Sequence, residues 1–144
     1  FCNIIMIRKL KKKDFKNFIN LINYFTKDIK PITKAQFEDY FDKIQNKNSQ
    51  VYVIEENNKI IGTGKVLFEY KFNKNLSKSA HIEDVVISEK CRGKGYGKKL
   101  IDFLTKLCKD EGCYKIILCS SIKNSNFYKK CNFQIKDLEM CIYF

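Results

Sequence analysis

Hydrophobic and polar residues repeat along this chain with two different periods. A period of two predicts strands, and apolar residues three and four positions apart predict helices. The clearest helix pattern follows a glycine-rich turn. Its apolar residues Leu100, Ile101, Leu104 and Leu107 share one face, and Gly112 marks its end. Strands are predicted over 4–9, 50–55, 59–70, 80–87, 115–120 and 138–144, and the other helices over 14–24, from about 33 to 44, and over 124–130.

Local turn and cap signals support this order of elements. Thr33 stands three residues before Gln36, which is the spacing of a capping box. Asn57 and Asn58 separate two strand patterns and predict a hairpin, while residues 71–80 form a polar connector. The order is that of a mixed α/β fold, and 144 residues with 44% hydrophobic content suit a single domain spanning 1–144.

Three glycines at alternate positions follow the strand over 80–87. Gly93, Gly95 and Gly97 let the backbone bend tightly and bring several N–H groups close to an anion. The helix that begins there adds the positive end of its dipole. The run predicts a phosphate-binding loop, although it is not a P-loop and fits the dinucleotide fingerprint only in part.

Two motifs around this loop carry a family resemblance. Arg92, Gly95 and Gly97 form an Arg-x-x-Gly-x-Gly pattern between a strand and a helix, and residues 124–133 contain N-x-x-F-Y-x-x-x-x-F. Together they resemble the GCN5-related N-acetyltransferase superfamily. The resemblance implies a central, mostly antiparallel sheet flanked by helices, acetyl-CoA as co-substrate and no metal.

Residues 82–86 and 113–116 narrow the resemblance within the superfamily. They are similar to members that acetylate the amine of glucosamine 6-phosphate by direct attack in a ternary complex. Such members make N-acetylglucosamine 6-phosphate for UDP-N-acetylglucosamine synthesis. The resemblance therefore implies an acyltransferase whose partner is a small amino-sugar phosphate.

The resemblance also implies roles for individual residues. Tyr128 is expected to protonate the leaving thiolate, and Asn124 to contact CoA or cap its helix. A main-chain N–H among residues 85–87 is expected to stabilise the oxyanion. The cofactor contacts implied are Val85, Val86, Ile87, Arg92, Gly93, Lys94, Gly95, Tyr96, Gly97, Lys98, Asn124, Phe127 and Tyr128. The acceptor contacts implied are Thr26, Lys71, Lys74, Glu83, Asp84, Val85, Tyr114 and Lys115.

Glu83 and Asp84 are the other two catalytic candidates. As neighbours on a strand they face opposite sides of the sheet, so only one side chain enters a site unless a β-bulge turns both. They lie between Ile82 and the apolar run 85–87, and two acidic residues inside so apolar a strand do not fit a fully solvated surface. We expect ligand contact.

Two positions depart from the family pattern. Cys119 stands where family members carry an acidic residue, and Tyr143 where an arginine reaches the phosphate. These departures leave other functions open: an acetyltransferase acting on a protein, peptide or other small amine, a non-catalytic CoA-binding module, or a basic nucleic-acid-binding module.

Charge and cysteine content narrow the classes of partner. The formal charge is +12, but lysines are scattered over every predicted element and arginine occurs only at Arg8 and Arg92, so we expect a solvated basic surface and no nucleic-acid partner. The seven cysteines lack C-x-x-C spacing. They predict reduced thiols and a cytoplasmic protein.

The sequence also predicts how the chain meets membranes and other copies of itself. No apolar run approaches the roughly 20 residues of a membrane span, so no membrane partner is expected. The apolar end of the chain, residues 140–144, suits contact between two subunits. With the family's usual assembly, it predicts a homodimer.

Overall fold

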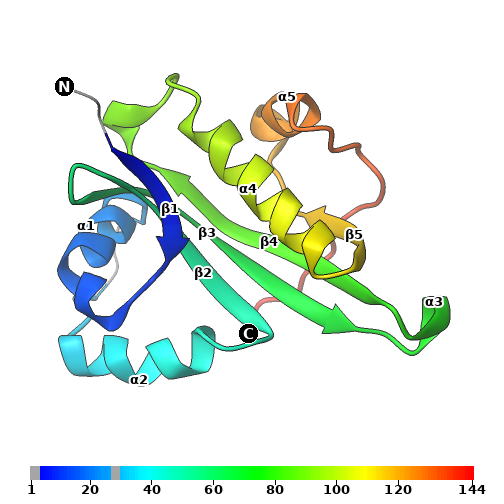
Figure 1. Ribbon diagram of the computed structural model, residues 1–144, viewed down its shortest axis with the longest axis horizontal. Helices are drawn as coiled ribbons and strands as arrows, with labels where there is room; N and C mark the ends of the chain where they lie inside the picture. Colours follow the sequence, from blue (N-terminus) through cyan, green and yellow to red (C-terminus); the bar gives the residue numbers. More distant parts are fainter. Residues whose placement is uncertain (1–3, 27–29) are drawn as a thin grey trace.

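The core of the protein is one sheet of five strands in sequential order, seen in a computed structural model that describes residues 4–26 and 30–144 (Figure 1). The first four strands are antiparallel neighbours, and the fifth lies parallel to the fourth. The strands are β1 (Ile5–Lys9), β2 (Ser49–Glu56), β3 (Lys59–Tyr70), β4 (Lys78–Ile87) and β5 (Cys113–Leu118). The mixed α/β fold with a mostly antiparallel sheet is confirmed.

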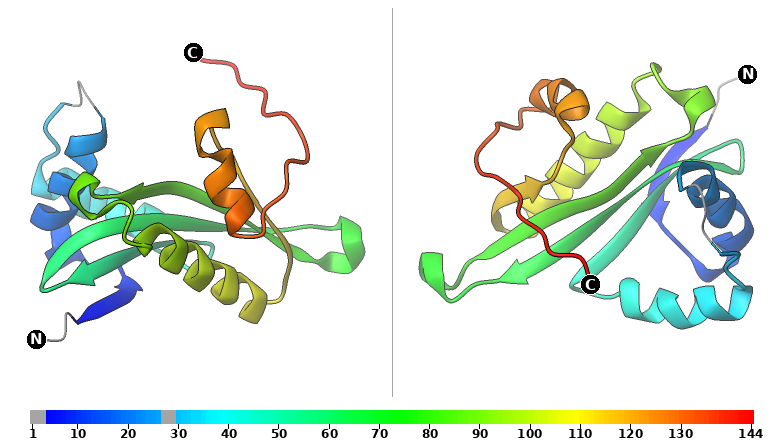
Figure 2. Two further views of the ribbon diagram at one scale, coloured as in Figure 1. Left: turned by 90° about the horizontal axis from the view of Figure 1, so that it is seen from above. Right: turned by 180° about the vertical axis from the view of Figure 1, so that it is seen from behind.

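Helices cover both faces of this sheet (Figures 1 and 2). Helix α4 packs on one face with the larger apolar cluster, and α1 and α2 pack on the other face with the smaller one. Short 3-10 turns precede α1 and α4. The helical segments are η1 (Lys12–Asp14), α1 (Phe15–Phe25), α2 (Lys34–Ile44), α3 (Asn73–Leu76), η2 (Glu89–Cys91), α4 (Tyr96–Asp110) and α5 (Ile122–Lys130).

The predicted local signals are present in the structure. The Thr33 hydroxyl accepts from the Gln36 N–H at 3.2 Å, and the Gln36 side chain accepts from the Thr33 N–H at 2.9 Å, which completes the capping box. Asn57 and Asn58 both have positive φ, as the two central residues of a tight hairpin turn require. The turn therefore fixes the register of β2 against β3.

A close approach of α4 to β3 fixes the position of the glycine-rich loop. A Cβ atom at Gly64 would lie 3.1 Å from Leu104 and 3.3 Å from Leu100, so only glycine lets the helix lie this near the strand. Both leucines are fully buried, and burial of one such side chain contributes about 1.5–3 kcal/mol. Because α4 is held along its length, its first turn is held beside the end of β4.

A partly buried ion network ties β1 to the start of α1. The Arg8 guanidinium donates to both Asp14 oxygens, at 2.7 and 3.0 Å, and its Nε donates to Glu55 at 2.8 Å. Burial alone would raise the pKa of Asp14, but the hydrogen bonds from Arg8 and from the Lys11 N–H hold that pKa below its usual value. Asp14 is therefore charged at neutral pH and holds Arg8 in place.

The predicted strand over 138–144 is wrong. Residues 133–144 form neither helix nor strand, and their apolar side chains are exposed, for example Leu138 at 93% and Ile142 at 80%. A strand needs a neighbouring strand to satisfy its backbone groups, and no strand of residues 4–26 or 30–144 pairs with this segment. Smaller shifts occur elsewhere: β4 begins at Lys78, inside the predicted connector, and α5 begins at Ile122.

Membrane-spanning helices and metal sites are both absent from the described residues. None of their helices is long and apolar enough to span a membrane. No group of three or more His, Cys, Asp or Glu side chains among them is arranged to hold a metal ion.

Candidate active site

Strands β4 and β5 separate in the middle of β4. Their parallel pairing runs from Lys78 opposite Cys113 to Ile82 opposite Leu118, and stops there. Beyond that point β4 continues to Ile87, paired only with β3. The β4 edge over residues 83–87 is therefore left open to a ligand lying between the two strands.

A β-bulge lies on β4 where the strands separate. The pairs Lys65–Glu83 and Thr63–Val86 span two steps on β3 but three on β4, so β4 contains one extra residue. Asp84, with φ +52°, occupies the bulge. Non-glycine residues rarely adopt this conformation and concentrate at functional sites.

The bulge decides which way the two acidic side chains face. Ile82 and Val85 both pack in the cluster on the α4 side of the sheet. The two residues between them, Glu83 and Asp84, are thus both placed toward the α1 and α2 side. The sequence allowed both to enter one site only if a bulge turned them, and the structure contains that bulge.

The glycine-rich loop leads from the end of β4 into α4. Gly93 and Gly95 have φ of +75° and +84°, and nothing lies within 4 Å of where their Cβ atoms would be. The first N–H groups of α4 have no acceptor within the helix, because the first helical bond runs from the Lys99 N–H to Gly95 O. Open space above exposed N–H groups is what a pyrophosphate requires.

Side chains around the loop have more varied roles than the sequence predicted. Arg92 donates from Nε to Ile87 O at 3.3 Å and stacks on Phe25 at the end of α1, with 5.2 Å from Cζ to the ring centroid. The Tyr96 side chain is only 7% exposed and donates to Glu56, so Tyr96 can offer a ligand only its main chain. Lys94 is exposed, and Lys98 is paired with an acidic residue one turn further along α4.

Helix α5 packs against the first turn of α4. A Cβ atom at Gly97 would lie 3.1 Å from the Phe127 ring, so this third glycine provides a close contact between helices. The cap of α5 is Ser121, whose hydroxyl accepts from the Asn124 N–H at 3.3 Å. The alternative that Asn124 caps the helix is therefore wrong, and its contact with CoA stays a prediction.

Tyr128 lies on α5 between two other rings. Its ring centroid is 5.0 Å from that of Phe127 and 6.1 Å from that of Phe133, both edge to face. Burial raises the pKa of the Tyr128 phenol above its usual value. Among the described residues no hydrogen bond engages its hydroxyl, so the phenol is protonated at neutral pH and available to a ligand.

A pocket lined mostly by apolar side chains, with one ion pair among them, opens on the α1 side of the bulge; we call it the acceptor pocket. Its volume is about 350 Å³, and the only charged side chains in its described lining are Lys65 and Asp84, joined at 2.9 Å. The lining residues are Phe18, Ile22, Phe25, Thr26, Ile44, Val51, Thr63, Lys65, Asp84 and Val86. Thr26 and Asp84 were predicted acceptor contacts, whereas Lys65 and Thr63 were not.

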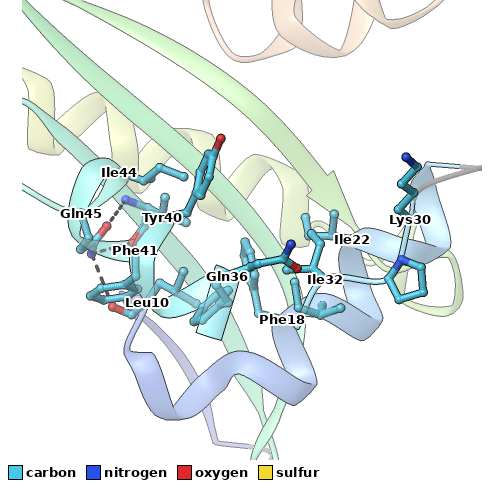
Figure 3. A pocket seen from close by; sticks show the side chains of 14 residues that line it. Leu10, Phe18, Ile22, Lys30, Ile32, Gln36, Tyr40, Phe41, Ile44 and Gln45 are labelled. Atoms are coloured by element: carbon cyan, nitrogen blue, oxygen red, sulfur yellow. Dashed lines mark hydrogen bonds between the residues drawn. The ribbon is translucent and has the colours of Figure 1, made fainter. Parts of the chain in front are cut away.

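A second cavity of about 390 Å³ lies between α1 and α2 (Figure 3). Its side chains are mostly apolar, as Leu10, Phe18 and Phe41 illustrate, and Lys30 is the only charged residue in the described lining. Unlike the acceptor pocket, this cavity has no carboxylate in its described lining that could pair with the amine of an amino sugar. The acceptor pocket is therefore the better site for a charged acceptor.

Four other predicted acceptor residues lie away from this pocket within the chain. Lys71 follows β3 and pairs with Glu69 at 3.1 Å, and Lys74 is on α3 at the far end of the β3–β4 hairpin (Figure 1). Six residues of extended strand separate Lys71 from Lys65, about 20 Å. Tyr114 and Lys115 lie at the start of β5, so their roles stay predictions.

Cys119 follows β5 directly, one residue beyond the last β4–β5 pair, and lies near enough to Glu83 for the charge of that residue to act on its thiol. Its thiol donates a hydrogen bond to the Glu139 carboxylate, which comes from the segment after α5. That segment runs back across the sheet on the face covered by α1 and α2 (Figure 2). The hydrogen bond to Glu139, followed by burial and the nearby Glu83 charge, raises the pKa of Cys119. A carboxylate thus reaches position 119 from elsewhere in the chain.

Comparison with known proteins places this geometry in a family. Residues 13–133 match the model of the acetyltransferase (GNAT) family. A glucosamine 6-phosphate N-acetyltransferase of Arabidopsis thaliana is 42% identical over 143 residues, covering 96% of this chain and 95% of the relative. A glucosamine 6-phosphate N-acetyltransferase 1 of Dictyostelium discoideum is 37% identical, with 96% and 90% covered.

Solved structures agree with the sequence relatives. The crystal structure of the Arabidopsis thaliana enzyme has a TM-score of 0.91 at 40% identity, covering 98% of this chain and 99% of that one. An aminoglycoside N-acetyltransferase solved in complex with CoA shares the fold alone, with a TM-score of 0.76 at 15% identity, covering 100% of this chain and 95% of that one.

The chain belongs to the GNAT family of acetyltransferases. It is an acyltransferase, and the relatives named above are glucosamine 6-phosphate N-acetyltransferases.

Proposed function

We propose that the protein transfers the acetyl group of acetyl-CoA to the amine of glucosamine 6-phosphate. The observation that carries this proposal is the acceptor pocket, which presents one ammonium and one carboxylate beside the open edge of β4. Glucosamine 6-phosphate has the complementary pair, an amine and a phosphate. The relatives' names support the same acceptor.

The residues present fit acetyl-CoA as co-substrate. The open backbone at Gly93 and Gly95, with the first turn of α4, would hold the pyrophosphate, and Arg92 and Lys94 add positive charge beside it. When bound, acetyl-CoA supplies an acetyl group activated as a thioester. The gap between β4 and β5 gives that group a place next to backbone donors.

Different groups of the chain then have separate roles in the acetyl transfer. A main-chain N–H on the open β4 edge, among Val85, Val86 and Ile87, stabilises the negative charge that develops on the carbonyl oxygen. Glu83 and Asp84 hold the amine and the sugar hydroxyls on the α1 side of the bulge. The Tyr128 hydroxyl gives its proton to the departing sulfur.

The acetyl group passes directly to the amine rather than through a cysteine. Cys119 is the thiol beside Glu83, and its hydrogen bond to Glu139 raises its pKa. A neutral thiol is a poor nucleophile. We infer that the Glu139 carboxylate, which accepts the hydrogen bond of Cys119, takes the place of the family's acidic residue and accepts a proton or hydrogen bond from the acceptor.

Mass spectrometry of the products tests the proposal. The protein is incubated with acetyl-CoA and, separately, with glucosamine 6-phosphate, glucosamine, a polyamine and a peptide with a free N-terminus. We expect acetylation of the phosphorylated sugar at a kcat/KM well above that of every other amine. Preferred transfer to the peptide or polyamine would replace the proposed acceptor, and binding of acetyl-CoA without transfer would make the protein a CoA-binding module.

We also propose that the protein is a homodimer joined through its C-terminal segment. Leu138, Met140, Ile142 and Phe144 are all at least 80% exposed, although each is strongly apolar. Residues 133–144 form neither helix nor strand and pair with no strand among the described residues. Light scattering coupled to size-exclusion chromatography is expected to give twice the chain mass at micromolar concentration, and a monomer there would contradict the proposal.

The setting proposed for this activity is the cytoplasm and the synthesis of UDP-N-acetylglucosamine. The cysteines of the described residues are free thiols, which suits a reducing compartment. Fluorescence microscopy of the tagged full-length protein in its own cells, and a fall in UDP-N-acetylglucosamine on its depletion, test the two parts separately.

A further inference from the structure

We propose that Lys65 binds the phosphate of the acceptor and sets the preference for a phosphorylated over an unphosphorylated amino sugar. The inference rests on the proposed function and goes further, because it assigns the phosphate to a residue of β3 that the sequence motifs did not indicate. Lys65 lies in the lining of the acceptor pocket.

Lys65 is an inward-facing charge in the middle of an apolar strand. Its neighbours on β3 include Val66, which is fully buried on the α4 side, so alternation places Lys65 on the α1 side. The Lys65 side chain is 23% exposed, and its stem lies among apolar pocket residues such as Phe18 and Ile22. A lysine in this setting buries its stem and keeps its ammonium at the opening.

The Lys65 ammonium now pairs with Asp84, but this pair is weakly held. Asp84 is 68% exposed, and an ion pair with so exposed a partner is screened by water. A ligand can therefore replace either partner at small cost. An acceptor that carries both an ammonium and a phosphate replaces both at once, with its amine on Asp84 and its phosphate on Lys65.

Other cations of the chain are less well placed for this role. Among the described residues of the pocket lining, Lys65 is the single cation. Lys71 is paired with Glu69 at the far end of β3, and Arg92 is held by Ile87 O and Phe25 beside the cofactor loop. Because lysine makes a flexible, monodentate phosphate contact, Lys65 can follow the phosphate without a change in the backbone.

The bulge keeps the two charges of the pocket at fixed places. Asp84 is carried to the pocket side by its left-handed backbone, and Lys65 stands directly opposite Glu83 in the register. The amine end of the acceptor is thus held near the open β4 edge, while its phosphate end is held over β3. Because Lys65 and Asp84 are in contact at 2.9 Å, the flexible Lys65 side chain is expected to turn from Asp84 to the phosphate when the acceptor binds, which leaves the amine on Asp84 and directed toward the thioester.

The test compares two acceptors in the wild type and three variants. Lys65→Met removes the charge but retains a stem of similar length, Lys65→Arg restores a cation, and Lys59→Met is the matched control, an exposed lysine at the start of the same strand. For each protein, kcat and KM are measured for glucosamine 6-phosphate and for glucosamine at saturating acetyl-CoA, with product quantified by mass spectrometry.

Loss of a charge-assisted hydrogen bond predicts a rise of about 10- to 100-fold in KM for glucosamine 6-phosphate in Lys65→Met. The kcat/KM for glucosamine is expected to stay within about twofold, because that acceptor has no phosphate to bind. Lys65→Arg is expected to recover part of the loss, and Lys59→Met to match the wild type. Equal effects on both acceptors, or no effect on either, would overturn the assignment.

A binding measurement covers the case of a poorly folded Lys65→Met. Glucose 6-phosphate has the phosphate but no amine, so it is expected to compete with the acceptor in the wild type and more weakly in Lys65→Gln. Unchanged competition would overturn the assignment. Wild-type protein that acetylates neither amino sugar would instead overturn the proposed function, and the role of Lys65 with it.

Discussion

Replacing Tyr128 by phenylalanine should separate catalysis from stability. The change removes one hydroxyl and leaves the ring in its edge-to-face contacts with Phe127 and Phe133, at 5.0 and 6.1 Å. Because no hydrogen bond among the described residues engages that hydroxyl, the free energy of unfolding should change by less than about 0.5 kcal/mol.

The expected loss of transition-state stabilisation is much larger than this change in the free energy of unfolding. General acid catalysis contributes typically 10²- to 10⁴-fold, so kcat should fall by about that factor, or roughly 3–5 kcal/mol of transition-state stabilisation. Burial raises the pKa of the Tyr128 phenol, so the wild type keeps this proton until the pH rises through that raised value. The ratio of the two rates should therefore stay constant between about pH 7 and pH 9.

The assay measures kcat by mass spectrometry of the acetylated product and stability by thermal unfolding of the same samples. Tyr70→Phe is the control, because Tyr70 is an exposed tyrosine at the end of β3. A Tyr128→Phe protein with kcat within about threefold of the wild type would refute the proton-donor role. A protein that loses stability in proportion to its rate would assign Tyr128 to packing instead.

Three further predictions concern groups around the site and in the core. Asp14→Asn leaves the partly buried Arg8 with only its Glu55 partner, so the free energy of unfolding at pH 7 should fall by about 3 kcal/mol. Since the folded pKa of Asp14 lies below its usual value, the difference from the wild type should shrink as the pH falls below about 4, which acid titration of urea unfolding would reveal. Cys119→Ser should retain kcat within about fivefold, and the wild type should give no acetylated protein by intact mass, because a thiol with a raised pKa is not the nucleophile; a trapped acetyl group on wild-type Cys119 would contradict this. Gly97→Leu should displace Phe127 and raise KM for acetyl-CoA by at least tenfold, with the acceptor KM less affected, and equal changes in the two constants would argue against a local effect.

The fold was predictable from the sequence wherever local signals were strong. Thr33 with Gln36, and Asn57 with Asn58, marked a helix start and a hairpin that the structure confirms. Residues 138–144 have the apolar content of a strand, but whether such a segment becomes one depends on a neighbouring strand. No local pattern contains that information.

The candidate site was predictable in its motifs but not in its long-range contacts. Gly93 and Gly95 line the loop as expected, because their backbone conformation is a local property. Glu139 lies 20 residues from Cys119 in sequence, and only the course of the chain after α5 brings them together. Lys65 did have a signal, a charge within an apolar strand, which indicates a polar partner or ligand across from it.

The extra residue in β4 has a consequence for how this family can vary. Val86 faces the α1 side and Ile87 the α4 side only because Asp84 shifts the count by one. Deleting that residue would restore regular pairing between β3 and β4. The side chains on one side of the deletion would then move to the opposite face of the sheet. A substitution in this strand changes the contacts of one side chain. A single-codon deletion or insertion would reverse the facing of every side chain on one side of it, either those before the bulge or those at Val85, Val86 and Ile87. Over evolutionary time, the strand can exchange its side chains but is bound to keep its number of residues.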